Sequence, residues 1–183
     1  SFMIKIIKYF FEFIFIYLFF IIIKIVGISI SRILFSSVFI KIGPVIRSNN
    51  IIKKNLNIFS NKLSEKNKNE IVEKMWSNYG KTFVEYMFLK KFRKENSHIT
   101  IKGKKILDEI YYKNKPVIFV SGHFANFELM SMEITKNKIN LATIYRPLNN
   151  LFLNPLMEYL RKKYVCKNQI KKGLLGVKEC IKY

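Results

Sequence analysis

The sequence predicts an α/β fold, with an N-terminal membrane-associated helix followed by a mostly parallel sheet flanked by helices. A long apolar segment near the N-terminus predicts the membrane-associated helix. Further along the chain, short apolar runs bounded by turn residues alternate with helical patterns, as is typical of parallel sheets covered by helices. Residues 178–183 have the pattern of a helix that ought to lead into another strand, so we expect the domain to be C-terminally incomplete.

The N-terminal apolar segment is long enough to reach across a bilayer. It covers residues 9–30, in which Glu12 and Lys24 are the only charged residues. At about 1.5 Å per residue this length just spans a hydrocarbon core, although the two charges are also compatible with a flat or tilted interfacial helix. A cleaved signal peptide fits less well because no small-x-small cleavage site follows the run. We expect residues 1–42 to form a membrane anchor and residues 43–183 to form a separate domain.

The middle of the chain predicts one strong helix. Gly43 and Pro44 are expected to break the chain, and residues 47–63 have the composition of a polar connection. Ser64 is a suitable N-cap for a helix that continues to about Leu89. Its apolar residues recur at spacings of three and four, which indicates one stripe of core packing. The stripe consists of Val72, Met75, Trp76, Tyr79, Phe83, Tyr86 and Met87.

The remainder of the chain alternates between short strands and helices. The residues at 116–120 form an apolar run between turn residues, which predicts a buried strand. Pro155 suits the first turn of a helix, and Gly173 marks the start of the last one. We expect strands at 99–101, 116–120 and 139–145, and helices at 104–112, 124–135, 155–163 and after Gly173.

The charge of the chain favours a membrane or an acidic partner over nucleic acid. The net charge is +21, but only five of the 33 cations are arginine, and no nucleic-acid-binding motif occurs. The charge suits anionic lipid, a phosphorylated substrate or an acidic carrier protein. Cations concentrated after the apolar segment place the body of the protein on the cytoplasmic side. Cys166 and Cys180 have no companion ligands, so we expect neither a metal site nor a disulfide.

A histidine follows the expected strand at 116–120. His123 comes after Ser121 and Gly122, at a strand-to-helix junction, and in open α/β folds ligands bind at the carboxyl ends of strands. Glu128 lies roughly one and a half turns into the following helix and could orient or stabilise the imidazole. A general base with a carboxylate partner requires this arrangement, although the spacing alone is common by chance.

Three segments around this pair resemble the late acyltransferases of lipid A biosynthesis, the lauroyl and myristoyl transferase family, within the lysophospholipid acyltransferase superfamily. With the anchor, the resemblance covers nearly the whole chain, and the combination is far more specific than the His-x4-Glu motif alone. The segments are NLNIFSNKLSEKNKNEIVEKMWSNYGKTFVEY at 55–86, VIFVSGHFANFE at 117–128 and IYRPLNNLFLNPLMEYLRKKY at 144–164.

The resemblance implies an enzyme at the cytoplasmic face of the inner membrane. Such an enzyme moves a fatty acyl chain from acyl carrier protein to a hydroxyl or hydroxyacyl group of a lipid A precursor, without a cofactor. By this resemblance His123 is the base, and Glu128 orients it and stabilises its positive charge. Arg146 and Arg161 lie in matched segments and are expected to bind substrate; Arg161 could also stabilise the oxyanion.

Two alternatives remain open from the sequence. One is acyl transfer to another glycolipid or a phospholipid, and the other is a truncated, non-catalytic relative that binds anionic lipid. The family carries a further acidic motif after the next strand, whereas Asp108, the only aspartate here, lies upstream. We therefore expect residues 43–183 to be the N-terminal part of an acyltransferase domain whose site is completed beyond them.

Overall fold

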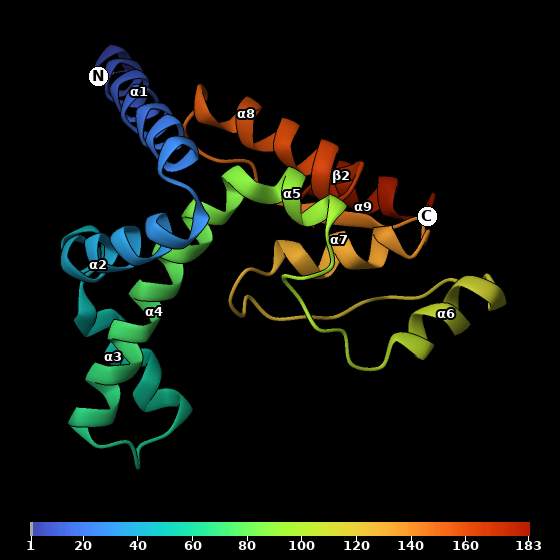
Figure 1. Cartoon of the computed structure of the whole chain (residues 1–183), viewed down its shortest axis with the longest axis horizontal. Helices are drawn as coiled ribbons and strands as arrows, with labels where there is room; N and C mark the ends of the chain where they lie inside the picture. The colour runs from blue at the N-terminus through green and yellow to red at the C-terminus, as the bar shows by residue number, and fades with distance from the viewer. Residues whose placement is uncertain (1) are drawn as a thin grey trace. The chain divides into compact units, whose positions relative to one another are not determined.

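The computed structural model describes residues 2–183, which form two compact units (Figure 1). One unit comprises residues 20–87, and the other comprises residues 88–183 together with the N-terminal residues up to Phe19. In chain order the helices and strands are α1 (Phe2–Val26), α2 (Ile28–Ile46), α3 (Asn49–Phe59), α4 (Glu65–Glu85), a 3-10 turn (Tyr86–Phe88), α5 (Leu89–Lys94), α6 (Lys104–Lys113), α7 (Glu128–Lys136), β1 (Ala142–Tyr145), α8 (Leu153–Leu160), a π-helical turn (Arg161–Val165), β2 (Asn168–Lys171) and α9 (Leu174–Cys180).

The unit of residues 20–87 is built on the packing of α2 against α4. Glycine lets the two helices approach closely, because a Cβ atom on Gly80 would lie 2.3 Å from the carbonyl oxygen of Phe35. On the same interface Phe83 contacts the rings of Phe35 and Phe39, at centroid distances of 5.5 and 5.6 Å. Val72 and Trp76 of the expected stripe are buried, whereas Tyr79 is 53% exposed. α4 ends at Glu85, so Tyr86 and Met87 lie in the 3-10 turn and not on the helix expected to reach Leu89.

The helix α4 begins where its cap predicts. The Ser64 hydroxyl accepts a hydrogen bond from the backbone N–H of Asn67 at 3.2 Å, which satisfies one of the unpaired donors of the first turn. The expectation of a polar connection over residues 47–63 is wrong, because α3 occupies most of it. Ser48 caps α3, because its hydroxyl accepts a hydrogen bond from the N–H of Asn50. The sequence did not predict this cap, because the surrounding asparagines are typical of a loop.

Gly43 and Pro44 do not break the chain and instead lie inside α2. Gly43 is required there by packing, since a Cβ atom at that position would lie 2.1 Å from the ring of Trp76. The helix ends soon afterwards, when the N–H of Arg47 bonds to the carbonyl oxygen of Gly43 at 2.9 Å. Tertiary packing on Trp76 thus overrides the local preference of a Gly-Pro pair to end a helix.

Two helices, α1 and α2, are long and apolar enough to cross a membrane by length and composition. Gly27 separates them, and its φ of +89° is a conformation that suits glycine. The sequence predicted a single apolar segment here. The structure divides it into two helices at this glycine.

The unit of residues 88–183 contains a two-stranded parallel sheet, with Ala142 opposite Asn168 and Tyr145 opposite Lys171. The parallel pairing of the sequence prediction is confirmed, although the described part of the chain is mostly helical. α5 and α7 pack against the π-helical turn that follows α8 (Figure 1). Arg93 links these elements, because its guanidinium donates to the carbonyl oxygens of Met132 on α7 and Val165 on that turn.

Two of the expected strands are absent from the described residues. Residues 116–120 are extended but unpaired, and Ile118 and Val120 are 90% and 92% exposed. A buried strand needs neighbouring strands and covering helices, and no described segment supplies them to this run. Residues 99–101 are irregular as well, whereas β2 (Asn168–Lys171), which the sequence did not predict, pairs with β1.

Candidate active site

A buried ion pair joins the start of α7 to the end of α8. Arg161 Nε donates to Glu128 Oε1 at 2.7 Å, and the two side chains are only 14% and 7% exposed. Glu128 is the first residue of α7, and Arg161 is the first residue of the π-helical turn that continues α8. Because α7 packs directly on that turn, residues 33 positions apart meet away from solvent.

The start of α7 is displaced from its expected position at Phe124. Ala125 has a φ of +47°, in the left-handed region, which interrupts a right-handed helix. The segment before Glu128 is therefore a loop, and His123 lies on it with an exposed side chain. A loop position leaves the imidazole accessible to a substrate approaching from solution.

The His123 ring contacts Phe127, with centroids 4.2 Å apart and planes tilted by 52°. The structure therefore brings Glu128 together with Arg161, while the contact it gives His123 is aromatic. His123 still lies five residues before the buried carboxylate on the loop that enters α7. In apo structures catalytic hydrogen bonds are often long and become short only in the complex with substrate.

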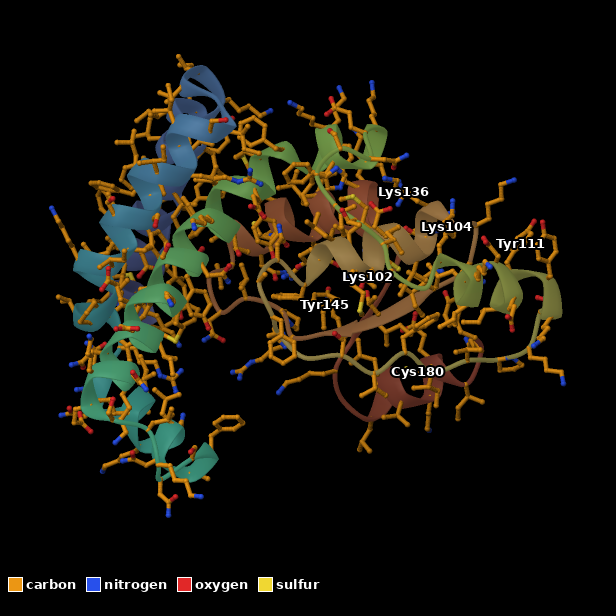
Figure 2. The ribbon with its side chains drawn as sticks, turned by 60° about the horizontal axis from the view of Figure 1, so that its bottom comes forward. Lys102, Lys104, Tyr111, Lys136, Tyr145 and Cys180 are labelled. Atoms are coloured by element: carbon orange, nitrogen blue, oxygen red, sulfur yellow. The ribbon has the colours of Figure 1, made fainter. Side chains whose placement is uncertain are left out.

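Arg146 follows β1 directly, on the exposed carboxyl end of the strand. The preceding residue, Tyr145, is labelled in Figure 2, and its hydroxyl is buried near the Glu158 carboxylate. Burial raises the pKa of Tyr145 to about 12, and the nearby Glu158 carboxylate acts in the same direction. A buried phenol that stays protonated is a hydrogen-bond donor, and nothing in the sequence spacing indicated it.

Glu158 extends this polar group along α8. Lys162 donates to its carboxylate at 3.0 Å, and that bond lowers the pKa of Glu158 below its usual value. Arg161 adds a positive charge beside Tyr145, opposing the rise of the phenol pKa. The site thus combines two carboxylates, an arginine and a neutral phenol within one unit, a set able to bind anions and move protons.

Asn150 is a second residue whose role the sequence did not reveal, although it lies in a matched segment. Its side-chain oxygen accepts from the N–H groups of Phe152 and Leu153, both at 3.0 Å, and so caps the start of α8. Its amide donates to the carbonyl oxygen of Tyr9 at 2.9 Å and to Glu12 at 3.2 Å. One buried amide therefore joins the N-terminal half of α1 to the start of α8, the helix that Arg161 follows.

The cysteines and acidic residues offer no metal site within residues 2–183, where no group of three or more possible ligands occurs. The Cys166 thiol is buried and donates to the carbonyl oxygen of Leu141 at 3.0 Å. Burial raises the pKa of this thiol, which favours the unreactive protonated form. Cys166 therefore has the environment of a structural residue.

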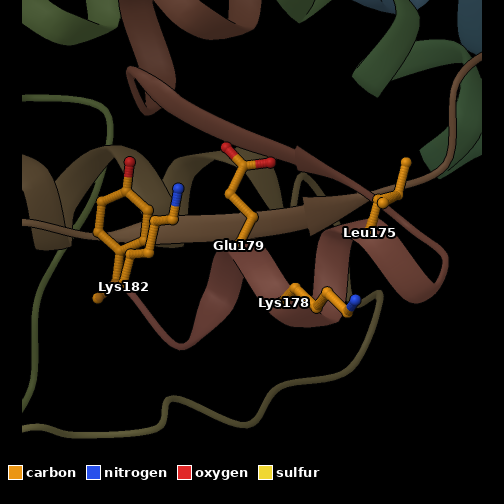
Figure 3. Close-up of a pocket in the computed structure, with 5 residues that line it drawn as sticks. Leu175, Lys178, Glu179 and Lys182 are labelled. Atoms are coloured by element: carbon orange, nitrogen blue, oxygen red, sulfur yellow. The ribbon is translucent and has the colours of Figure 1, made fainter.

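A surface pocket lies on α9 and the residues that follow it (Figure 3). It shares no residue with the Glu128–Arg161 pair or with the loop that carries His123. Its lining mixes two lysines, a glutamate and exposed apolar atoms. The lining residues are Leu175, Lys178, Glu179, Lys182 and Tyr183.

The candidate site therefore consists of the buried Glu128–Arg161 ion pair and of His123, which is exposed on the loop before α7. The model of the bacterial lipid A biosynthesis acyltransferase family matches residues 2–173. The chain therefore belongs to that family. Searches among curated proteins and among solved structures found no match.

Proposed function

We propose that this protein transfers a fatty acyl chain from acyl carrier protein to a hydroxyl or hydroxyacyl group of a lipid A precursor. The observation that carries the proposal, beside membership of the family, is the buried Glu128–Arg161 ion pair at the start of the helix that His123 precedes. Residues 43–183 supply the chemistry, and residues 1–42 attach the protein to the cytoplasmic face of the inner membrane.

In the proposed reaction His123 takes the proton of the acceptor hydroxyl. The oxygen attacks the thioester carbonyl carbon, forming a C–O bond and a tetrahedral oxyanion. The oxyanion then collapses with cleavage of the C–S bond, and the imidazolium returns its proton to the departing thiolate. A hydroxyl is a poor nucleophile near neutral pH, and a positioned base typically contributes about 10² to 10⁴ in rate.

Glu128 and Arg161 act as a unit in this scheme. The Glu128 carboxylate stabilises the positive charge that develops on the imidazole, and it also fixes the guanidinium of Arg161 by accepting from Nε. A guanidinium keeps its positive charge at any working pH, and in this scheme the charge of Arg161 stabilises the oxyanion. Holding the guanidinium in place before substrate binds avoids the cost of reorganising it during the reaction.

Arg146 is assigned to substrate binding. It is exposed at the end of β1, where a permanently charged fork can bind a phosphate of the acceptor or of the carrier's phosphopantetheine arm. A lipid A precursor and acyl carrier protein are both anionic, in keeping with the net charge of +21. Acyl transfer to another glycolipid uses the same groups and differs only in the acceptor.

The test is acyl transfer from a purified carrier thioester to a lipid A precursor by the full-length protein. We expect His123→Ala and Glu128→Ala each to reduce the rate by at least about 10², the contribution of a positioned base. Asn149→Ala, at an exposed position near Arg146, is the matched control and should retain activity. Membrane association should be unchanged in all three variants, and normal activity in His123→Ala would refute the mechanism.

A further inference from the structure

The face of α2 that points away from α4 is predominantly apolar. Its exposed side chains form a row at spacings of four residues, flanked by Ile33 and Val45, which are 70% and 87% exposed. Contiguous apolar surface of this kind usually marks an interaction site. The row consists of Ile30, Leu34, Val38, Ile42 and Ile46.

The polar residues on this face are Ser29, Ser37 and Lys41, and Ser29 lies at the first turn of the helix. The Ser37 hydroxyl donates to the carbonyl oxygen of Ile33 at 3.1 Å, one turn back on the same helix, and so needs no solvent partner. Lys41 has a long stem that can keep its charge at the membrane surface while its methylenes lie against lipid.

The opposite face of α2 is bound to α4 by polar as well as apolar contacts. Arg32 Nη2 lies 2.7 Å from Glu85 Oε1 near one end of the interface, and Ser36 and Ser77 share a hydrogen bond of 2.6 Å. Near the other end Gly43 lies against the Trp76 ring. The two helices are therefore joined along most of α2 and enter any environment together.

Because α2 is packed against α4, it cannot cross a bilayer alone. α4 is about 32 Å long at 1.5 Å per residue, close to the thickness of a hydrocarbon core. A spanning α2 would carry the exposed charges of α4 into lipid, where each is costly. These charges are Glu65, Lys66, Glu70, Glu73, Lys74 and Lys81.

We propose that α2 lies flat in the interface of an anionic membrane, with its apolar row in the acyl-chain region and α4 on the aqueous side. Exposed cations flank the row at Lys24, Lys41 and Arg47, and they complement anionic headgroups. α1, itself apolar enough to enter lipid, ends one residue before α2. The inference rests on the proposed membrane location and is independent of the acyl-transfer chemistry.

The experiment measures the depth of α2 in vesicles of phosphatidylcholine and phosphatidylglycerol. The full chain carries Cys180→Ser, while the buried Cys166 is retained. An environment-sensitive fluorophore is placed singly at Ile30→Cys, Leu34→Cys, Val38→Cys or Ile42→Cys. Lys74→Cys on the outer side of α4 is the matched control, and Phe15→Cys on α1 reports membrane location. Lipids brominated at shallow or deep acyl positions quench the fluorescence.

A flat α2 predicts equal loss of fluorescence at all four positions with shallow bromines, and no loss at Lys74→Cys. Quenching by deep bromines at Leu34→Cys and Val38→Cys, with shallow quenching at Ile30→Cys, would show a spanning helix and overturn the inference. Quenching only at Phe15→Cys would leave the membrane location intact but assign the row to a protein partner. Absence of quenching at every position would refute the membrane location as well.

Discussion

His98 illustrates how burial controls a single titratable group. Its side chain is 7% exposed, its ring stacks on Phe92 at 4.6 Å, and Nε2 lies 3.5 Å from a Glu133 carboxylate oxygen. Burial lowers the pKa of His98 below its usual value of 6.5, and this effect outweighs the attraction of Glu133. The neutral imidazole is therefore the form that the fold favours.

The lowered pKa makes stability depend on pH in a defined direction. Below about pH 6.5 the unfolded chain binds a proton at His98 that the folded chain resists, so the free energy of unfolding falls as the pH falls through that value. Above it the contribution is fully present. Urea unfolding followed from about pH 5 to 7.5 should show this slope, and His98→Gln should flatten it.

His123 supplies the matched control for His98, because it is the only other histidine and its side chain is exposed. His123→Gln should retain the slope. An equal flattening by both variants would assign the effect to something other than the burial of His98.

Arg161 tests whether geometry or charge matters in the ion pair. Arg161→Lys preserves the charge but loses the planar guanidinium whose Nε donates to Glu128. We expect kcat to fall by about 10², as for removal of an oxyanion donor, with a small change in KM. Steady-state kinetics with the carrier thioester measure both constants.

Lys162→Arg is the control for Arg161→Lys, since Lys162 is the neighbouring cation and pairs with Glu158 near the surface. It should leave kcat unchanged. Full activity in Arg161→Lys would show that a positive charge at position 161 suffices. The planar guanidinium geometry would then not be required for catalysis.

At the scale of elements, the contact between α2 and α4 depends on a glycine. Gly80→Ala would place a Cβ atom 2.3 Å from the Phe35 carbonyl oxygen, which is backbone and cannot turn aside. We expect the helices to be forced apart at a cost of about 1–3 kcal/mol, the usual cost of overpacking. Urea unfolding monitored by circular dichroism and Trp76 fluorescence measures the loss.

Lys81→Ala is the comparison for Gly80→Ala, because Lys81 is adjacent on α4 but exposed. Alanine there should change stability by no more than about 0.5 kcal/mol. If Gly80→Ala were equally harmless, the close approach of α2 and α4 would be disproved.

At the scale of the whole chain, Asn150 connects residues about 140 positions apart within one unit. Asn150→Asp keeps an oxygen to cap α8 but loses the amide that donates to Tyr9, and it places a second carboxylate beside Glu12. We expect the N-terminal part of α1 to detach from this unit. Limited proteolysis should then cleave within α1 faster than in the parent protein.

Asn149→Asp introduces the same charge one residue earlier at an exposed position. Proteolysis of α1 should be unaffected in this variant. Equal acceleration by both variants would mean that net charge, and not the amide of Asn150, controls the attachment.

The sequence predicted those elements whose signals lie within a few residues of one another. Ser64 and its apolar stripe located α4, and the alternation of runs located α6, β1 and α8. The sequence did not predict α3, because a serine cap surrounded by asparagines has the composition of a loop. It wrongly predicted a strand at residues 116–120, because an apolar run does not show whether neighbouring strands are present to pair with it. The family resemblance correctly identified the class of protein.

The sequence by itself determined the apolar N-terminus, the His123 and Glu128 spacing and membership of an acyltransferase family. Only the tertiary structure decided that Glu128 pairs with Arg161 and that Asn150 joins α1 to α8. It also decided that one face of α2 packs against α4 while the opposite face is exposed. The reason is physical. Periodicity and capping depend on neighbours along the chain, whereas burial and ion pairing depend on which distant segments meet in space.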